Sequence, residues 1–209
     1  MKKKCLPNCC HLRFFHGFPS PEAFDLYIDD KPFAKNILYE DFTSYYSLLA
    51  QDYTLTICHH RKKEVLFSQK LRLHMKKNYT MALFPTRHQD YQLLLLNEPP
   101  KEIPEEMLLA RTINLSCEVE PLKLIFKEIK PAFKPLQSAH FTSYLAYKCE
   151  TYHLQLFKPS TEKSLYEQKK LYLKPSRYYA FYIIGGMNTY PLKVISSIEG
   201  SSLYHFETT

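Results

Sequence analysis

The sequence repeats itself at a spacing close to one hundred residues. The motif Phe-Thr-Ser-Tyr at residues 42–45 returns at residues 141–144, 99 positions later. Tyr53 matches Tyr152 at the same spacing, whereas Leu71 matches Leu171 at 100, as if one residue were inserted between them. A period near one hundred is too long for a solenoid repeat of roughly 20–50 residues and has the size of a domain. The sequence therefore predicts two tandem copies of one domain.

Apolar and polar residues alternate along most of both copies. Tyr53, Leu55 and Ile57 share one face of a strand when side chains alternate with period two, and residues 152–156 repeat this pattern. Each copy reads as seven or eight short strands separated by polar turns, which is typical of a β-sandwich. We therefore expect an all-β protein.

Prolines mark the junction between the copies. Pro99 and Pro100 lack strand hydrogen-bond donors and stiffen the backbone. The best helix candidate, Pro104 to Arg111, lies next to them, with a proline near its start and two glutamates in its first turn. The expected organisation is an N-terminal tail at 1–10, a first sandwich at 11–97, a Pro-rich linker at 98–110 and a degenerate second copy at 111–209.

The motifs of common enzymes and of nucleic-acid binding are missing from the sequence. It holds no phosphate-binding glycine loop, no dinucleotide fingerprint and no His-Glu-x-x-His pair, so we expect no catalysis and no cofactor. The net charge of +7 allows weak attraction to anionic polymers. The aromatic residues at 178–182 alternate as a strand core does and lack the basic partners of a base-stacking surface, so no nucleic-acid binding is predicted.

The sequence also predicts a soluble protein. The basic residues Lys2 to Lys4 are not followed by the apolar stretch of roughly 7–15 residues that a signal peptide needs. The longest aliphatic run, Leu93 to Leu96, is too short for a transmembrane segment. We therefore expect synthesis in the cytoplasm without a signal peptide.

The first copy opens with a signature in which His16, Pro19, Asp25, Tyr27 and Asp29 are spaced as His-x-x-Pro and Asp-apolar-Tyr-apolar-Asp. This signature resembles that of the bacterial family catalogued as domain of unknown function 4397. The blocks at 42–45 and 50–55 resemble the family's next two blocks, so that the resemblance covers residues 11–97 and reaches the second copy through the internal repeat. It implies tandem immunoglobulin-like or transthyretin-like β-sandwich domains, common on bacterial surfaces, and no known catalytic activity.

The second copy departs from this signature. Residues 114–118 replace the His-x-x-Pro loop, and Leu124 stands where the match at 99 positions would place Asp25. Any role of the loop is therefore expected in the first copy alone.

Four residues of this loop region are candidates for ligand binding: His16, Pro19, Asp25 and Asp29. His16 and Asp25 suggest an acid–base or orienting pair. In the alternative interpretation, the two aspartates satisfy turn amides and His16 packs inside its loop.

Cysteines and histidines gather in two places and suggest a weak candidate metal site. Its members are Cys5, Cys9, Cys10, His11, Cys58 and His60. Zinc prefers four such ligands in two close pairs, but this spacing matches no recognised zinc finger. The alternatives are reduced thiols beside surface histidines, or disulfides formed after assembly or release.

Three tyrosines are predicted to be structural: Tyr27, Tyr53 and Tyr152. Tyr53 and Tyr152 each follow a polar turn, where a tyrosine hydroxyl can hydrogen-bond back to the nearby backbone, as in the tyrosine corner of sandwich folds.

These features lead to three hypotheses of function. The first is a non-catalytic structural or adhesive protein of a bacterium that binds protein partners or itself through edge strands, such as a spore-coat or envelope component. The second is a module that binds a carbohydrate or an anionic polymer through the loop from His16 to Asp25. The third is a metal-assisted enzyme that uses the N-terminal cysteines and histidines.

Overall fold

The computed structural model describes residues 8–98, 101–161, 163–187 and 189–200. Almost all of its regular structure is β-strand, which confirms the predicted all-β fold. The described residues divide into two compact units, 8–98 and 101–200. Within the described residues no helix is long and apolar enough to cross a membrane.

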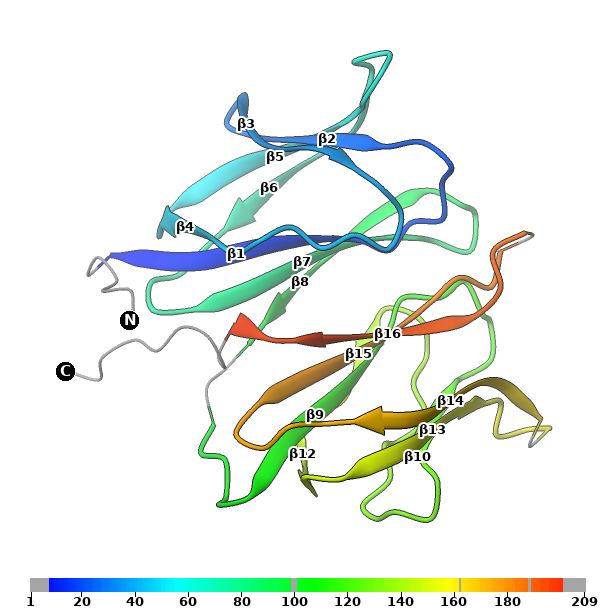
Figure 1. Ribbon diagram of the computed structural model, residues 1–209. Coiled ribbons are helices and arrows are strands. Elements are labelled where there is room, and N and C mark those ends of the chain that lie inside the picture. The colour runs from blue at the N-terminus through cyan, green and yellow to red at the C-terminus, as the bar shows by residue number, and fades with distance from the viewer. Residues whose placement is uncertain (1–7, 99–100, 162, 188, 201–209) are drawn as a thin grey trace. The chain divides into compact units, whose positions relative to one another are not determined.

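The first unit is a sandwich of two four-stranded sheets (Figure 1). Strand β1 pairs in parallel with β7, and the other pairings are antiparallel. One sheet has the order β4 (Tyr46–Leu49), β1 (Cys9–His16), β7 (Asn78–Pro85) and β8 (Tyr91–Asn97). The other has the order β3 (Lys31–Ile37), β2 (Phe24–Ile28), β5 (Asp52–His59) and β6 (Val65–Arg72).

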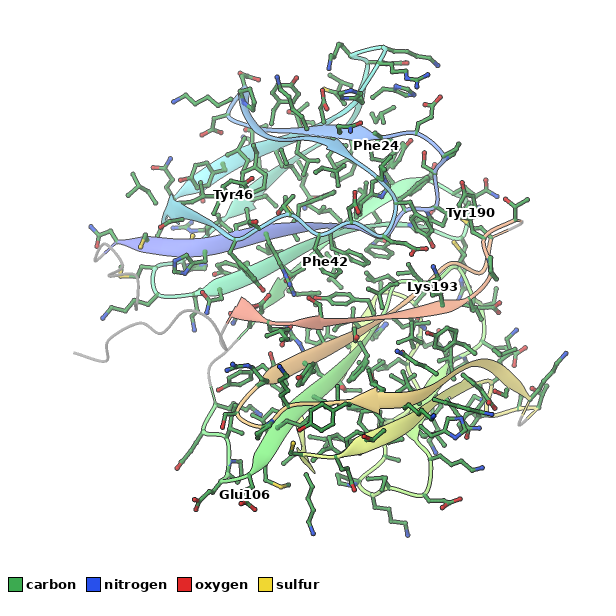
Figure 2. The ribbon with its side chains drawn as sticks, in the orientation of Figure 1. Phe24, Phe42, Tyr46, Glu106, Tyr190 and Lys193 are labelled. Atoms are coloured by element: carbon green, nitrogen blue, oxygen red, sulfur yellow. The ribbon has the colours of Figure 1, made fainter. Side chains whose placement is uncertain are left out.

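The core of the first unit lies between its two sheets. Alternate residues of β1, such as Leu12 and Phe14, enter this core together with Leu55 and Ile57 of β5. Figure 2 labels Phe24 of β2, which belongs to the same core and is almost fully buried. The period-two alternation of the sequence therefore places one face of each strand in the core.

The second unit has two corresponding sheets, one of five strands and one of three. One sheet has the order β11 (His140–Phe141), β9 (Met107–Asn114), β15 (Tyr178–Ile184) and β16 (Lys193–Ile198). A further short strand, β12 (Leu145–Lys148), also pairs with β9. The other sheet has the order β10 (Lys123–Phe126), β13 (Thr151–Phe157) and β14 (Ser164–Tyr172). As β1 does with β7, β9 pairs in parallel with β15.

Among the described residues of the second unit, no strand corresponds to β3. The matching segment, residues 130–136, contains Pro131 and Pro135 and makes only an isolated bridge between Leu122 and Leu136. Pro131 matches Pro32, which β3 tolerates, but Pro135 is an additional proline and removes one more N–H group that a strand ladder needs.

The residue that shifts the repeat from 99 to 100 positions forms a β-bulge in β14. In the first unit Thr54 of β5 faces only Lys70 of β6. In the second unit the register runs from Tyr152–Leu171 directly to Leu154–Gln168, so that His153 faces two residues, Lys169 and Lys170. Lys170 has a φ of 59°. A bulge absorbs an extra residue locally and leaves the residues beyond it on their original faces.

Three details differ from the sequence predictions. Pro104 to Arg111 is not helical, because Met107 begins β9 and Leu108 of that strand packs in the core. The second sandwich therefore begins within the predicted linker of 98–110. In the first unit β1 already begins at Cys9, inside the predicted tail, and residues 1–7 lie outside the described residues.

The third detail concerns the residue that replaces Asp25. Asp25 of β2 lies opposite Cys58 of β5 in the sheet. Phe157, 99 positions after Cys58, is the equivalent residue of β13, and the residue opposite it is Lys123 of β10. Lys123, and not Leu124, therefore takes the place of Asp25, because the two units are 98 positions apart along these strands.

Candidate functional site

Asp25 is a fully buried carboxylate on the outer face of β2, beneath the hairpin that joins β5 to β6. Its Oδ1 accepts a hydrogen bond from the backbone N–H of Asn36 at 2.9 Å and lies 2.6 Å from Nδ1 of His60. Its Oδ2 accepts a hydrogen bond from Nζ of Lys63 at 2.5 Å. Asp25 therefore fastens the β5–β6 hairpin and the residue Asn36 of β3 to the middle of the sheet.

The pKa of Asp25 predicts a loss of stability in acid. Burial alone would raise this pKa, but the hydrogen bonds from Lys63, Asn36 and His60 outweigh it and lower the pKa to about 2. A folded-state pKa below the unfolded value stabilises the protein above about pH 4, and this stabilisation is lost as the pH falls towards 2. We expect a loss of about 1–2 kcal/mol, reduced by solvent screening at the exposed Lys63.

Urea denaturation at several pH values between 2 and 6 measures this effect. The Asp25→Asn variant should lose most of the acid dependence, whereas Asp52→Asn, at an exposed carboxylate, should keep it. Equal acid dependence in the wild-type protein and in Asp25→Asn would contradict the assignment.

His16 does not join Asp25. It lies at the end of β1, is fully buried, and stacks on the ring of Phe24 with a centroid distance of 4.4 Å. Among the described residues neither ring nitrogen of His16 has a hydrogen-bond partner, and burial lowers its pKa to about 3. Pro19 is buried as well, so of the four candidate ligand-binding residues only Asp29 is exposed.

The described members of the candidate metal site point in different directions. Cys10 lies in the core between the sheets, Cys9 precedes it on the opposite face of β1, and Cys58 pairs with Asp25 on the outer face of the other sheet. His11 is 3.0 Å from Oδ1 of Asn78. No group of three or more potential metal ligands occurs within the described residues, and Cys5 lies outside them.

Two of the thiols, those of Cys58 and Cys117, have raised pKa values. No disulfide joins any two of the cysteines among the described residues. Burial, together with the nearby carboxylate of Asp25, raises the pKa of Cys58, and burial raises the pKa of Cys117 to about 11. These two thiols therefore stay protonated at neutral pH, which makes them poor nucleophiles.

Both corner tyrosines bind the backbone four residues earlier. The hydroxyl of Tyr53 donates to the carbonyl of Leu49 at 2.9 Å, and that of Tyr152 donates to the carbonyl of Lys148 at 2.5 Å. Each bond ties the start of the central strand, β5 or β13, to the end of the strand before it. Tyr27 lies half-buried in β2.

A surface hollow of about 350 Å³ lies beside Tyr53. Asp29, in the turn after β2, contributes a carboxylate whose Oδ1 accepts the backbone N–H of Thr54. Two further lining residues, Asp52 and Arg72, form an ion pair at 3.7 Å with both side chains about three-quarters exposed. With Lys70, the hollow presents hydrogen-bond acceptors and donors of both charges on the outer face of the sheet, while Tyr53 itself packs in the core.

A second hollow, of about 310 Å³, occupies the corresponding place in the second unit. The other corner tyrosine, Tyr152, lines it, together with Glu128 in the turn after β10 and His153. The backbone around it matches the first hollow, because the backbone N–H of Asp29 donates to the carbonyl of Thr54 and the backbone N–H of Lys127 donates to the carbonyl of His153. Both units thus have a hollow with mixed charge beside the same tyrosine.

Each unit contains a buried arginine that the sequence pattern did not reveal. Arg13 of β1 and Arg111 of β9 are almost fully buried on the face of their strand that points away from the core between the sheets. The repeated Phe-Thr-Ser-Tyr motif covers them. The guanidinium of Arg13 lies 4.7 Å from the ring centroids of both Phe42 and Tyr45.

The second unit repeats this arrangement around Arg111. Its guanidinium lies 5.8 Å from the ring of Phe141 and 5.0 Å from that of Tyr144. Rings at this distance attract a cation through their electron-rich faces. The motif was visible in the sequence, but the arginine that it covers lies about 30 residues earlier and could be found only by comparing the two copies.

A fully buried glutamate completes each arginine cluster. In the second unit Nε of Arg111 donates to Glu199 at 3.0 Å, and the hydroxyl of Tyr144 also donates to this glutamate. Burial alone would lower the pKa of Arg111, but Glu199 outweighs it and raises the pKa. This guanidinium is therefore always charged.

In the first unit a threonine bridges the two charges. Nε of Arg13 donates to Oγ1 of Thr80 at 2.7 Å, and this hydroxyl donates to Glu98 at 2.5 Å. Tyr45 donates to the same glutamate at 2.8 Å. Ala180 takes the place of Thr80 in the second unit, so the arginine there reaches its glutamate directly.

These features define a class: an all-β protein of two β-sandwich units, each with a buried arginine–glutamate cluster and a polar hollow beside a corner tyrosine. The model of the family described as domain of unknown function (DUF4397) matches residues 10–125, more than half of the chain. The chain belongs to this family.

No curated protein matches the chain. The similar solved structures include the family 26 carbohydrate-binding module CBMbc from Eubacterium rectale Amy13K, solved with maltoheptaose, at 10% identity over 92% of this chain and 99% of that chain, with a TM-score of 0.27. Family 41 α-glucan-recognising modules from streptococcal virulence factors match at 13% identity over 85% of this chain and 94% of theirs, also with a TM-score of 0.27. Scores this low do not establish a common ligand.

Proposed function

We propose that the protein is a non-catalytic binding protein that holds a carbohydrate in the hollow beside Tyr53. The observation that carries this proposal is the recurrence of a hollow with acidic and basic side chains beside the corner tyrosine of each unit. Sugar hydroxyls both donate and accept hydrogen bonds, so a site that binds them uses carboxylates and cationic side chains together.

The mixture of charges favours a neutral carbohydrate over an anionic polymer. Asp29 and Asp52 would repel a polyanion, and they offset the attraction of Lys70 and Arg72. The site differs from the loop inferred from the sequence, because His16 and Asp25 are buried while Asp29 is exposed. Asp29 is thus the one residue shared by the two versions of the site.

Affinity electrophoresis tests the proposal with native gels that contain amylopectin, barley β-glucan, xylan or heparin. We expect at least one neutral polysaccharide to retard the protein. The Asp29→Ala variant should bind it about 10-fold more weakly or worse, because a lost hydrogen bond to a charged group costs about 1.5–3 kcal/mol.

Asp90→Ala is the matched control, because Asp90 is an exposed turn aspartate outside the hollow. It should bind like the wild-type protein. Retardation by heparin alone, or equal binding by the Asp29 and Asp90 variants, would contradict the proposal.

A structural role in a bacterial assembly, such as a spore coat or envelope, stays a prediction. The observation that favours assembly is the edge strand β6, five of whose eight side chains are exposed. The cellular compartment likewise stays a prediction from the sequence.

A further inference from the structure

The first hollow, beside Tyr53, and the second hollow, beside Tyr152, are built from matching parts of the fold. Each is lined by the turn after the second strand of its unit, β2 or β10, and by the start of the central strand, β5 or β13. Asp30 and Glu128 occupy the same place in the two turns, with φ of 61° and 65°. The fold therefore fixes the place of the hollow, and the duplication copied it.

The charged residues of the first hollow are not kept in the second unit. Three of them are Asp29, Asp52 and Arg72. The second unit has residues of another kind at the matching places: Lys127, Thr151 and Tyr172. These three changes alone would remove both carboxylates from the second hollow.

The second hollow regains the same chemistry from other positions. Glu128 and Glu150 supply two carboxylates, and Lys127 supplies a cation. Asp30 and Gln51, which stand at the places of the two glutamates, are not among the residues that line the first hollow. The mixture of acceptors and donors is thus retained although the residues that provide it have changed.

A carboxylate also lies near the tyrosine hydroxyl in each unit. Burial raises the pKa of Tyr53, and the negative charge of Asp29 adds to this rise. Burial likewise raises the pKa of Tyr152, and the negative charge of Glu150 adds to it. Asp29 and Glu150 therefore have the same position relative to their tyrosine hydroxyls in electrostatic terms.

The edge strand contributes to the first hollow but not to the second. Lys70 and Arg72 of β6 line the first hollow, whereas no described residue of β14 lines the second. In β14 the bulge at Lys169 and Lys170 redirects the side chains at this place. The second hollow therefore offers fewer cationic donors to a ligand.

We propose that the hollow beside Tyr152 is a second and weaker binding site for a neutral carbohydrate, so that one chain holds two sugar segments. Glu128 and Glu150 accept hydrogen bonds from sugar hydroxyls, and Lys127 donates to them. The inference rests on the proposed function of the first hollow. It extends that function to the second copy, in which the loss of the His-x-x-Pro loop leaves the hollow in place.

Isothermal titration calorimetry of the full chain counts the sites. The ligands are hexasaccharides derived from amylopectin, barley β-glucan and xylan. For the one whose parent polysaccharide retards the protein, we expect two molecules bound per chain, the second about tenfold more weakly because the donors of β6 are missing. Glu150→Ala should leave only the tighter site, Asp29→Ala only the weaker site, and the double variant neither.

Glu105→Ala is the matched control, because Glu105 is an exposed glutamate of the second unit outside this hollow. It should keep both sites. Glu128→Asn removes the other carboxylate, and asparagine tolerates the positive φ of this position. It should weaken the second site as Glu150→Ala does, while circular dichroism shows an intact fold in both variants.

The outcomes separate this inference from the proposed function. A single site that is lost in Asp29→Ala and unchanged in both glutamate variants overturns the inference and leaves the proposed function intact. A single site that is lost in Glu150→Ala and kept in Asp29→Ala supports the inference and overturns the proposed role of the first hollow. If none of the three hexasaccharides binds, both proposals are overturned.

Discussion

Replacing Glu199 with glutamine is expected to lower the free energy of unfolding by about 3–5 kcal/mol. Glu199 is fully buried against the guanidinium of Arg111, which is itself almost fully buried. Removing one partner leaves the other charge without its counter-ion in a medium of low polarity, and the desolvation cost is then no longer offset. A domain stable by about 5–15 kcal/mol can be largely unfolded by such a loss.

Urea denaturation followed by circular dichroism measures this loss. Glu167→Gln is the matched control, because Glu167 lies exposed on β14 and its ion contact with His153 is at the surface. It should change the free energy of unfolding by less than about 1 kcal/mol.

A double variant separates the loss of a charge partner from general damage to the site. Arg111→Met with Glu199→Leu removes both charges and fills a similar volume, so it should be more stable than Glu199→Gln alone. If Glu199→Gln is as stable as the wild-type protein, the buried ion pair is not the main contribution of this cluster.

Replacing Phe126 with alanine is expected to cost about 3–5 kcal/mol. Phe126 of β10 is the centre of the aromatic core of the second unit. Its ring centroid lies 4.3 Å from that of Tyr152, 4.8 Å from that of Tyr147 and 5.6 Å from that of Phe181. The substitution would leave a cavity and remove these ring contacts. Each ring contact contributes to stability in addition to the apolar area that it buries.

The same denaturation experiment measures this effect, with Val119→Ala as its control. Val119 is 61% exposed, so its truncation should change the free energy of unfolding by about 0.5 kcal/mol or less. Comparable losses in the two variants would show that Phe126 does not anchor the core.

Local pattern was enough to predict the all-β fold and most of its strands. Alternation at Tyr53, Leu55 and Ile57 correctly predicts which face of β5 is buried, because side-chain direction in a strand depends only on parity. The same local reasoning failed at Pro104 to Arg111. A proline and two glutamates there are typical of a helix start, but pairing with β15, some 70 residues later, makes residues 107–114 a strand.

The candidate site was harder to predict, because its contacts join residues far apart in the sequence. Asp25 and His16 are close in the chain, yet Asp25 binds Lys63, 38 residues away, and His16 packs on Phe24. From the sequence alone, a buried polar residue next to a loop cannot be distinguished from an exposed ligand-binding residue, because the residues that bury it are known only from the fold. The burial of Arg13 and Arg111 was hidden for the same reason.

The stepwise change in spacing between the two units affects how chimeras of this protein must be built. Equivalent residues lie 98 positions apart at Arg13 and Arg111, 99 at the corner tyrosines, and 100 beyond the bulge. If segments are exchanged at one fixed spacing, a strand is shifted by one residue and its core side chains point to solvent. If they are exchanged at equivalent positions in the turns between strands, every side chain stays on its own face. A segment that carried Lys169 and Lys170 into the first unit would also introduce the β-bulge of β14 at the edge of that sheet.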